Sequence, residues 1–167
     1  FRHWDTWRDT YSHLFIAELN GDKMVNPVDI LESEPHDFPN RPFGGMEQLS
    51  WHPDGKRLVY SCHKKDGKAY AISTNTDIYI YDLETRQTVN FTEGMMGYDD
   101  APVYSPDGKY IAWSSMERDG YEADKKRLMV VTLESKSRVD YTGYVDQDAE
   151  HMVWADDSQS IYFVAYW

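Results

Sequence analysis

The sequence repeats itself, and this repeat limits the possible folds more than any other feature. The segments Leu49–Tyr60 and Val103–Trp113 share the motif Pro-Asp-Gly-Lys, and a third, degenerate copy occupies Val153–Phe163. The aspartates of the three copies are spaced by 53 and 50 residues: Asp54, Asp107 and Asp157. Self-similarity with a period of about 50 residues is typical of repeat architectures, among them β-propellers.

Each repeat has the composition of paired β-strands. The Pro-Asp-Gly turn lies between short runs of Tyr, Trp, Val, Ile and Leu, which indicates a hairpin, because proline presets φ and glycine accepts a positive φ. A second β-rich unit, Asp77–Arg86, recurs 50 residues later at Arg127–Lys136. Apolar residues nowhere follow a sustained helical period, so little helix is expected. Four strands per repeat, named a to d from the centre outward, correspond to one blade of a propeller.

This pattern predicts an all-β fold, a partial β-propeller of about three four-stranded blades, of which two are complete and two are half. Residues 1–29 are expected to supply strands c and d of one blade, and residues 146–167 strands a and b of another. Residues 43–95 and 96–145 are the expected complete blades. Because propellers close at typically 4–8 blades, we expect the chain to be a fragment, or its open edges to be covered by other chains or by self-association.

One segment, residues 30–42, departs from the period and is assigned as an inserted connector. The interval from Leu19 to Glu47 is 28 residues, against 17 from Leu83 to Asp100, a difference of 11. The extra residues are rich in proline and in acidic side chains. We expect an extended loop between neighbouring blades, either a solvated connector or part of a binding rim.

Charge and cysteine content argue against several classes of function. Lys and Arg number 17 and Asp and Glu 29, so the net charge is −12. Such a surface repels phosphate backbones and anionic lipids, and we expect neither nucleic acid nor membrane as a partner. The single cysteine, Cys62, allows no internal disulfide and no cysteine-based zinc site. Aromatic residues make up 15% of the chain, which is unlike a disordered acidic segment.

The repeats resemble the Trp-Ser-Pro-Asp-Gly-Lys repeats of TolB-like propellers. Within that group the chain is similar to the N-terminal propeller of the prolyl oligopeptidase family (S9) of serine peptidases, especially the bacterial dipeptidyl-peptidase 5 and acylaminoacyl-peptidase branch. The resemblance covers essentially the whole chain. Besides the two Pro-Asp-Gly-Lys repeats, the segments that carry it are Arg2–Trp7, Ser12–Phe15, Ala112–Asp124 and Lys126–Leu128.

The resemblance implies a two-part enzyme, in which a propeller restricts the access of small peptides to an α/β-hydrolase domain with a Ser-Asp-His triad. This chain contains no Gly-x-Ser-x-Gly motif, so the nucleophile elbow is missing and no catalytic residue is assigned. The expected partners are the remaining blades and the hydrolase domain of the same polypeptide, together with short peptides. A periplasmic or secreted location in a bacterium is expected, and no cofactor.

Three acidic residues occupy equivalent positions, seven residues before the aligned turn aspartates: Glu47, Asp100 and Glu150. This position lies near the start of the innermost strand, close to the central channel of a propeller. Carboxylates that converge there would attract a cation, for example the free α-amino group of a peptide. Alternatively, each acid accepts hydrogen bonds from its own connecting loop, as aspartate does in turns.

Four further residues are candidates for contact with a substrate or with a neighbouring domain. Arg118, together with Tyr121, would reach a substrate carboxylate or that domain, although Arg-Asp-Gly is also an ordinary turn sequence. Trp4 and Trp7 would stack on a ligand or dock another domain, or else pack between blades. The stretch Asp146–Glu150 resembles the start of a calcium loop but lacks the glycine and the distal glutamate, so no metal site is assigned.

Two functions remain open from the sequence. One is the non-catalytic propeller portion of a secreted or periplasmic exopeptidase, a dipeptidyl- or acylaminoacyl-peptidase, which gates and orients short peptides. The other is a TolB-like propeller that binds a protein or glycan partner without enzyme activity. A propeller glycosidase is disfavoured, because no pair of acids has a sequence context that sets one as acid and the other as base.

Overall fold

The computed structural model describes residues 2–3, 6–7 and 9–166, with side chains from residue 9 onward. Its centre consists of two four-stranded antiparallel sheets, in each of which neighbouring strands follow one another along the chain. The strands of the first sheet are β5 (Leu49–Trp51), β6 (Arg57–Cys62), β7 (Asp77–Asp82) and β8 (Gln87–Asn90). The strands of the second sheet are β9 (Asp99–Tyr104), β10 (Tyr110–Ser115), β11 (Arg127–Thr132) and β12 (Arg138–Asp140).

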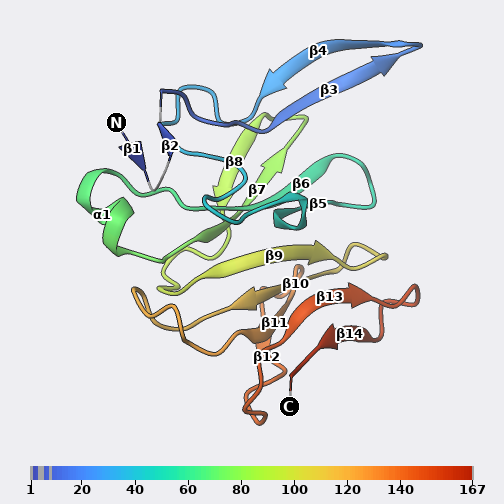
Figure 1. Ribbon diagram of the computed structural model, residues 1–167. Coiled ribbons are helices and arrows are strands. Elements are labelled where there is room, and N and C mark those ends of the chain that lie inside the picture. Colours follow the sequence, from blue (N-terminus) through green and yellow to red (C-terminus); the bar gives the residue numbers. More distant parts are fainter. Residues whose placement is uncertain (1, 4–5, 8, 167) are drawn as a thin grey trace.

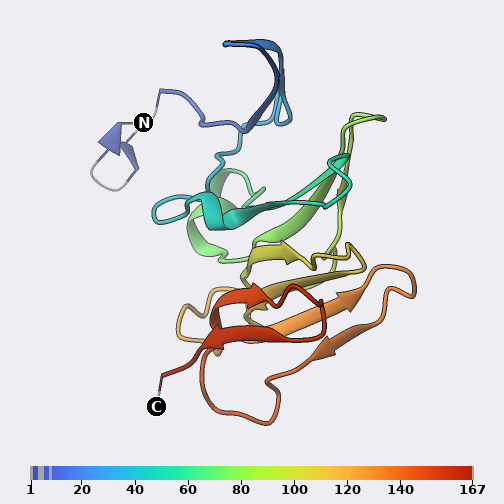
Figure 2. The same cartoon turned by 90° about the vertical axis from the view of Figure 1, so that its right-hand side faces the viewer.

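Two-stranded hairpins flank these sheets (Figure 1). The strand β3 (Phe15–Asn20) pairs with β4 (Lys23–Asp29) before the first sheet, and β13 (Glu150–Trp154) pairs with β14 (Ile161–Val164) after the second. The remaining elements are β1 (Arg2–His3), β2 (Thr6–Trp7), the 3-10 helix η1 (Met46–Gln48) and the helix α1 (Gly67–Ile72). The sheets follow one another in chain order in both views (Figure 1, Figure 2). The prediction of an all-β partial propeller with two complete and two half blades is confirmed.

The repeated aspartate makes the same hydrogen bond in all three turns. Its Oδ1 accepts from the backbone N–H two residues later, with N–O distances of 2.8, 3.0 and 2.9 Å at Asp54, Asp107 and Asp157. The residue after it has a positive φ in each copy, 70° at Gly55, 72° at Gly108 and 60° at Ser158. Glycine adopts this conformation without steric cost, and a serine does so less readily. The degenerate copy therefore keeps the turn because its aspartate supplies the same bond.

Adjacent turns also contact each other. Nε2 of His52 lies 3.1 Å from the carbonyl oxygen of Gly108, and because a carbonyl can only accept, the ring nitrogen donates. A Cβ placed on Gly108 would stand 2.6 Å from that ring. On the other side of the same turn, the backbone N–H of Asp107 donates to Oγ of Ser158 at 3.0 Å. Each turn is thus attached to the next along the row of blades.

Three apolar clusters occupy the spaces on either side of the two central sheets. Consecutive residues of a strand point to opposite faces, so Val59 of β6 packs with Trp113 of β10 between the sheets, while Leu58 and Tyr60 pack on the other side. Ala112 of β10 joins the cluster next to the last hairpin. Both faces of each central sheet are therefore covered, which explains why these strands read as nearly continuous apolar runs.

The connector, residues 30–42, is not the solvated loop that its composition suggested. Ile30, Leu31 and Phe38 are buried in the cluster beside β6, and the Phe38 ring meets the Tyr60 ring edge-on at 5.9 Å. The backbone N–H of Ser12 donates to Oδ1 of Asp37 at 2.9 Å. The prolines and acids give the segment a polar average, but its few apolar residues lie together on the side that faces the sheet.

The helix α1 lies in the connection between β6 and β7 and begins at the glycine of a Lys-Asp-Gly sequence. Asp66 stands at its N-cap position and makes no side-chain capping bond, and Gly67 opens the helix with a φ of 54°. With six residues, α1 is too short to produce a periodic apolar signal. Among the described residues, no helix has the length and apolarity that crossing a bilayer requires.

Candidate functional site

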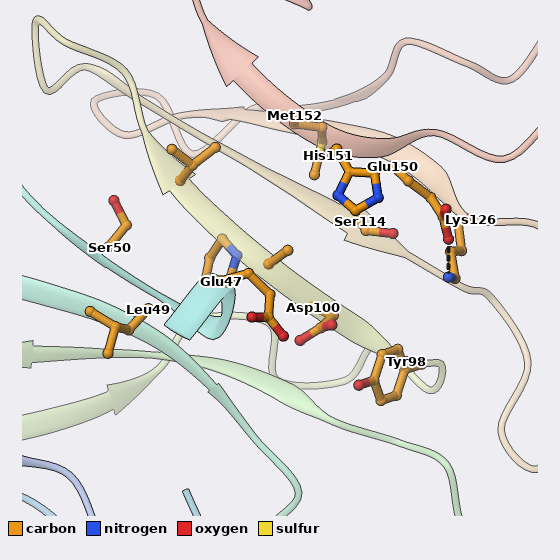
Figure 3. Close-up of a pocket in the computed structure, with 13 residues that line it drawn as sticks. Glu47, Leu49, Ser50, Tyr98, Asp100, Ser114, Lys126, Glu150, His151 and Met152 are labelled. Carbon is orange, nitrogen blue, oxygen red and sulfur yellow. Dashed lines mark hydrogen bonds and ion pairs between the residues drawn. The ribbon is translucent and has the colours of Figure 1, made fainter. Parts of the chain in front are cut away.

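A pocket of about 380 Å³ lies where three successive units of the repeat meet (Figure 3). Its walls come from η1, from β5 of the first sheet, from β9 and β10 of the second sheet, and from β13 of the last hairpin. Leu49, Pro102, Val103 and Met152 give it apolar walls. The charged and larger polar side chains of the lining are Glu47, Tyr98, Asp100, Lys126, Glu150 and His151.

The pocket brings together the three acids that the repeat alignment singled out. Glu47 on η1 and Asp100 on β9 lie on one side of it, and Glu150 on β13 lies on the other (Figure 3). Glu47 is exposed to solvent, and it takes part in none of the ion pairs formed by the described residues. Equivalent positions in successive repeats thus converge, as expected for the inner strands of a propeller.

Asp100 is held by donors from the neighbouring blade. Its Oδ1 accepts from Oγ of Ser61 and from Nε2 of Gln48, both at 2.7 Å. Burial raises the pKa of the Asp100 carboxyl above its usual range; hydrogen bonds from Ser61 and Gln48 oppose this rise, and the charge of Glu47 adds to it. These side-chain donors come from across the blade boundary, so the alternative in which each acid bonds only its own connecting loop does not describe Asp100.

Glu150 is paired with a cation inside the pocket. Oε1 of Glu150 forms an ion pair with Nζ of Lys126, which immediately precedes β11 of the adjacent sheet. The backbone N–H of Lys126 also donates to Oδ1 of Asp148, at 2.8 Å. With Glu150 neutralised in this way, the uncompensated negative charge of the pocket lies on the side of Glu47 and Asp100.

Arg118 and Tyr121 lie outside this pocket and contact each other. The guanidinium carbon of Arg118 stands 4.3 Å from the centre of the Tyr121 ring, and its Nη2 donates to Oδ1 of Asp124 at 2.7 Å. Oδ2 of Asp124 accepts from the backbone N–H groups of Glu117 and Arg118. These bonds close the β10–β11 loop on itself. Trp4 lies outside the described residues; Trp7 is part of β2, and the structure describes its backbone only.

Asp119 does more than complete a turn. Its Oδ1 accepts from Oγ of Ser73 and from the backbone N–H groups of Thr74 and Asn75, at 2.8, 2.8 and 3.2 Å. The backbone N–H of Gly120 returns a bond to Oγ1 of Thr74 at 2.9 Å. The β10–β11 loop is thereby attached to the β6–β7 connection of the preceding blade, which holds the two central sheets together on the side away from the Pro-Asp-Gly turns.

Sequence reasoning missed three charged or larger polar residues of the lining, Tyr98, Lys126 and His151, and also Gln48, which is buried behind the wall and donates to Asp100. Three of these four residues are chain neighbours of the predicted acids or lie two residues away, so proximity in sequence was the only available signal. His151 and Ala101, which follow Glu150 and Asp100, have positive φ values of 52° and 50°. The pairing register shifts in both strands next to these residues. No group of three or more metal-ligating side chains is found among the described residues.

Comparison with known proteins finds relatives named dipeptidyl-peptidase 5. No family model matches the chain. Its sequence is 48% identical over 165 residues to dipeptidyl-peptidase 5 of Porphyromonas gingivalis, covering 99% of this chain and 24% of that protein. It is 28% identical over 188 residues to dipeptidyl-peptidase 5 of Trichophyton schoenleinii, covering 98% of this chain and 25% of that protein. The chain thus spans about a quarter of the length of the curated relatives it matches.

Solved structures confirm the class of fold. A TolB-type protein of Agrobacterium tumefaciens superposes with a TM-score of 0.56 at 21% identity, over 84% of this chain and 42% of that one. An oligogalacturonate lyase of Vibrio parahaemolyticus gives a TM-score of 0.53 at 22% identity, over 90% of this chain and 35% of that one. The predicted resemblance to TolB-like propellers and to dipeptidyl-peptidase 5 is therefore confirmed.

Proposed function

We propose that this chain, a TolB-like propeller segment related in sequence to the dipeptidyl-peptidase 5 proteins, is the non-catalytic propeller portion of a secreted or periplasmic serine exopeptidase. In this role it gates and orients short peptides for a hydrolase domain in the same polypeptide. The observation that supports the proposal is the convergence of Glu47, Asp100 and Glu150, from three successive repeats, in one pocket with a single lysine.

The pocket suits a small cationic group attached to an apolar body. Glu47 and Asp100 supply two carboxylates on one side, where the free α-amino group of a peptide would receive charge-assisted hydrogen bonds. Leu49, Val103 and Met152 supply apolar contact for a short side chain. The chain itself performs no bond cleavage in this scheme; it fixes the amino end of the peptide, so that the distance to the scissile bond is set by the length of the substrate.

The test replaces each acid by its amide in the full-length enzyme: Glu47→Gln, Asp100→Asn and Glu150→Gln. We expect KM for a dipeptidyl substrate with a free amino group to rise about tenfold in the first two variants, because a hydrogen bond to a charged group is worth about 1.5–3 kcal/mol. Glu150→Gln should also raise KM, because it leaves the Lys126 cation unpaired in the pocket. In all three variants kcat should change little.

The matched control is a surface acid outside the pocket, Glu84→Gln, which should leave KM unchanged. A substrate with an acetylated amino group provides the second control, since it lacks the cation and should not distinguish wild type from variants. Unchanged kinetics in all three pocket variants would remove these acids from substrate binding. The binding-scaffold alternative would then gain support, provided that the full-length protein still binds a protein or glycan partner through the propeller.

A further inference from the structure

We infer that Gln48 is a positioning residue, which links the inserted connector to Asp100 and holds that carboxylate in place at the wall of the pocket. The inference rests on the proposed function, because it concerns how one of the two proposed ammonium-binding acids is oriented. Asn40 of the connector, Gln48 of η1 and Asp100 of β9 form one continuous chain of hydrogen bonds.

The side-chain amide of Gln48 has a single possible orientation. Its Oε1 accepts from the backbone N–H of Asn40 at 2.8 Å, and since a backbone N–H can only donate, the oxygen must face the connector. Nε2 then faces Asp100, to whose Oδ1 it donates at 2.7 Å, and it approaches the Tyr98 hydroxyl at 3.4 Å. The hydrogen bond from the connector therefore fixes the position of Nε2, the donor to Asp100.

A second path joins the same residues through β6. Oγ of Ser61 donates to Oδ1 of Asp100 at 2.7 Å, and Nδ2 of Asn40 donates to Oγ of Ser61 at 3.4 Å. Oδ1 of Asn40 accepts from the backbone N–H of His63 at 2.8 Å, which fixes the orientation of this amide as well. These two side-chain donors to Asp100, Gln48 and Ser61, thus lead back to the same connector residue.

The chain of bonds is buried, which makes each bond costly to lose. Gln48 and Ser61 are fully buried, and Asn40 is 5% exposed. A polar group left without a partner at such a position destabilises the structure, so a fully matched network holds its members in one arrangement. The connector is present once in the repeat pattern, and Gln48 aligns with Ala101 and His151 in the next two repeats. This means of support is therefore specific to Asp100.

The protonation of Asp100 responds to the groups around it. Glu47 and Tyr98 face it from its own side of the pocket, and Lys126, Glu150 and His151 line the rest of the wall. Burial raises the pKa of Asp100, and the Gln48 and Ser61 donors oppose that rise by favouring the carboxylate. Removal of either donor should therefore raise the pKa further, and it leaves the Asp100 carboxylate without one of the bonds that fix its orientation at the pocket wall.

The test measures Asp100 directly, by carbon-detected NMR titration of its carboxyl group in the 167-residue chain. Gln48→Met keeps the length of the side chain, remains neutral and has no donor. We expect it to raise the pKa of Asp100 by about one pH unit, because the ionised carboxylate loses one of the hydrogen bonds that favour it. Ser61→Ala, a smaller change, should shift it in the same direction. Gln87→Met at an exposed position of β8 is the matched control and should leave it unchanged.

A binding measurement separates this inference from the proposed function. Alanyl-alaninamide, with a free amino group, should bind Gln48→Met about tenfold more weakly than wild type at pH 7, while N-acetyl-alanyl-alaninamide should not distinguish them. If the pKa of Asp100 is unchanged in both Gln48→Met and Ser61→Ala, the inference is overturned, regardless of the measured peptide affinity. If the titration moves but Asp100→Asn binds alanyl-alaninamide as wild type does, Gln48 still positions Asp100 and the proposed amine binding fails.

Discussion

Asp99 carries a carboxyl group in the apolar space behind the pocket. It is fully buried, and the indole Nε1 of Trp113 donates to its Oδ1 at 2.9 Å. Its Oδ2 is buried without a hydrogen-bond partner among the described residues. Burial raises the pKa of Asp99 to about 6, because the ionised form is costly in these surroundings. Protonation of this one group is therefore coupled to folding.

The sign of the coupling follows from the raised pKa. The folded state binds the Asp99 proton more tightly than the unfolded chain, so the stabilising contribution is complete below the unfolded pKa of 3.8 and is lost as pH rises through about 6. We expect Asp99→Asn, which keeps the oxygen that accepts from Trp113, to gain about 2 kcal/mol of unfolding free energy relative to wild type between pH 4.5 and 7.5. Urea unfolding at both pH values, with Asp146→Asn as an exposed control, measures this. Parallel pH profiles of wild type and Asp99→Asn would contradict it.

The repeat alignment located the three acids because equivalent positions of successive blades meet in space. It could not show that they differ, with Glu47 exposed, Asp100 supported by Gln48 and Glu150 paired with a lysine. Those differences come from contacts that cross blade boundaries and are not repeated. Lys126, for example, belongs to a loop that has no counterpart of equal length in the preceding blade.

The Pro-Asp-Gly hairpins could be predicted because each turn contains its own determinants. The aspartate bonds the backbone two residues on, and the next residue accepts a positive φ. The conformations of the connector and of α1 could not be predicted in this way, because they depend on contacts with neighbouring parts of the fold. Leu31 and Phe38 are buried by the first sheet, and Gly120 lies against the carbonyl oxygen of Ile72, 3.4 Å from the place of a Cβ.

The two turn glycines provide a matched pair of substitutions. Gly55→Ala imposes a Cβ at a φ of 70° with nothing within 4 Å, so we expect a loss of about 1 kcal/mol from backbone strain alone. Gly108→Ala has nearly the same φ, 72°, but places its Cβ 2.6 Å from the His52 ring. We expect it to cost about 1–3 kcal/mol more, as overpacking does. Chemical denaturation of both variants tests this, and equal losses would show that the two turns are not packed on each other.

At the scale of the whole molecule, one face of the last hairpin is uncovered. Val153 and Tyr162 pair across β13 and β14 and are 60% and 68% exposed, whereas Trp154 and Ile161 on the opposite face pack against the second sheet. Blades of a propeller pack face to face, so we propose that this face meets a further blade in the complete protein. A contiguous apolar face of this kind favours association when it is exposed.

The 167-residue chain is therefore expected to self-associate in a concentration-dependent way, despite a net charge of −12 that opposes it. Tyr162→Lys introduces a charge at the centre of the exposed face and should restore a monomer, as measured by sedimentation velocity over a hundredfold range of concentration. Met96→Lys, at an exposed loop position, makes the same change in charge and should leave the association unaltered. A wild-type chain that stays monomeric throughout that range would contradict this expectation.

The bond from the Asp107 N–H to the Ser158 hydroxyl gives the last hairpin a built-in reporter. This amide proton belongs to a turn of the second sheet, yet its protection from solvent deuterium depends on a side chain of the next unit. This amide exchanges whenever the β13–β14 hairpin separates from the second sheet, even while the second sheet itself stays folded. The exchange lifetime of one amide thus records how often the terminal unit opens, and it would lengthen on closure of the ring.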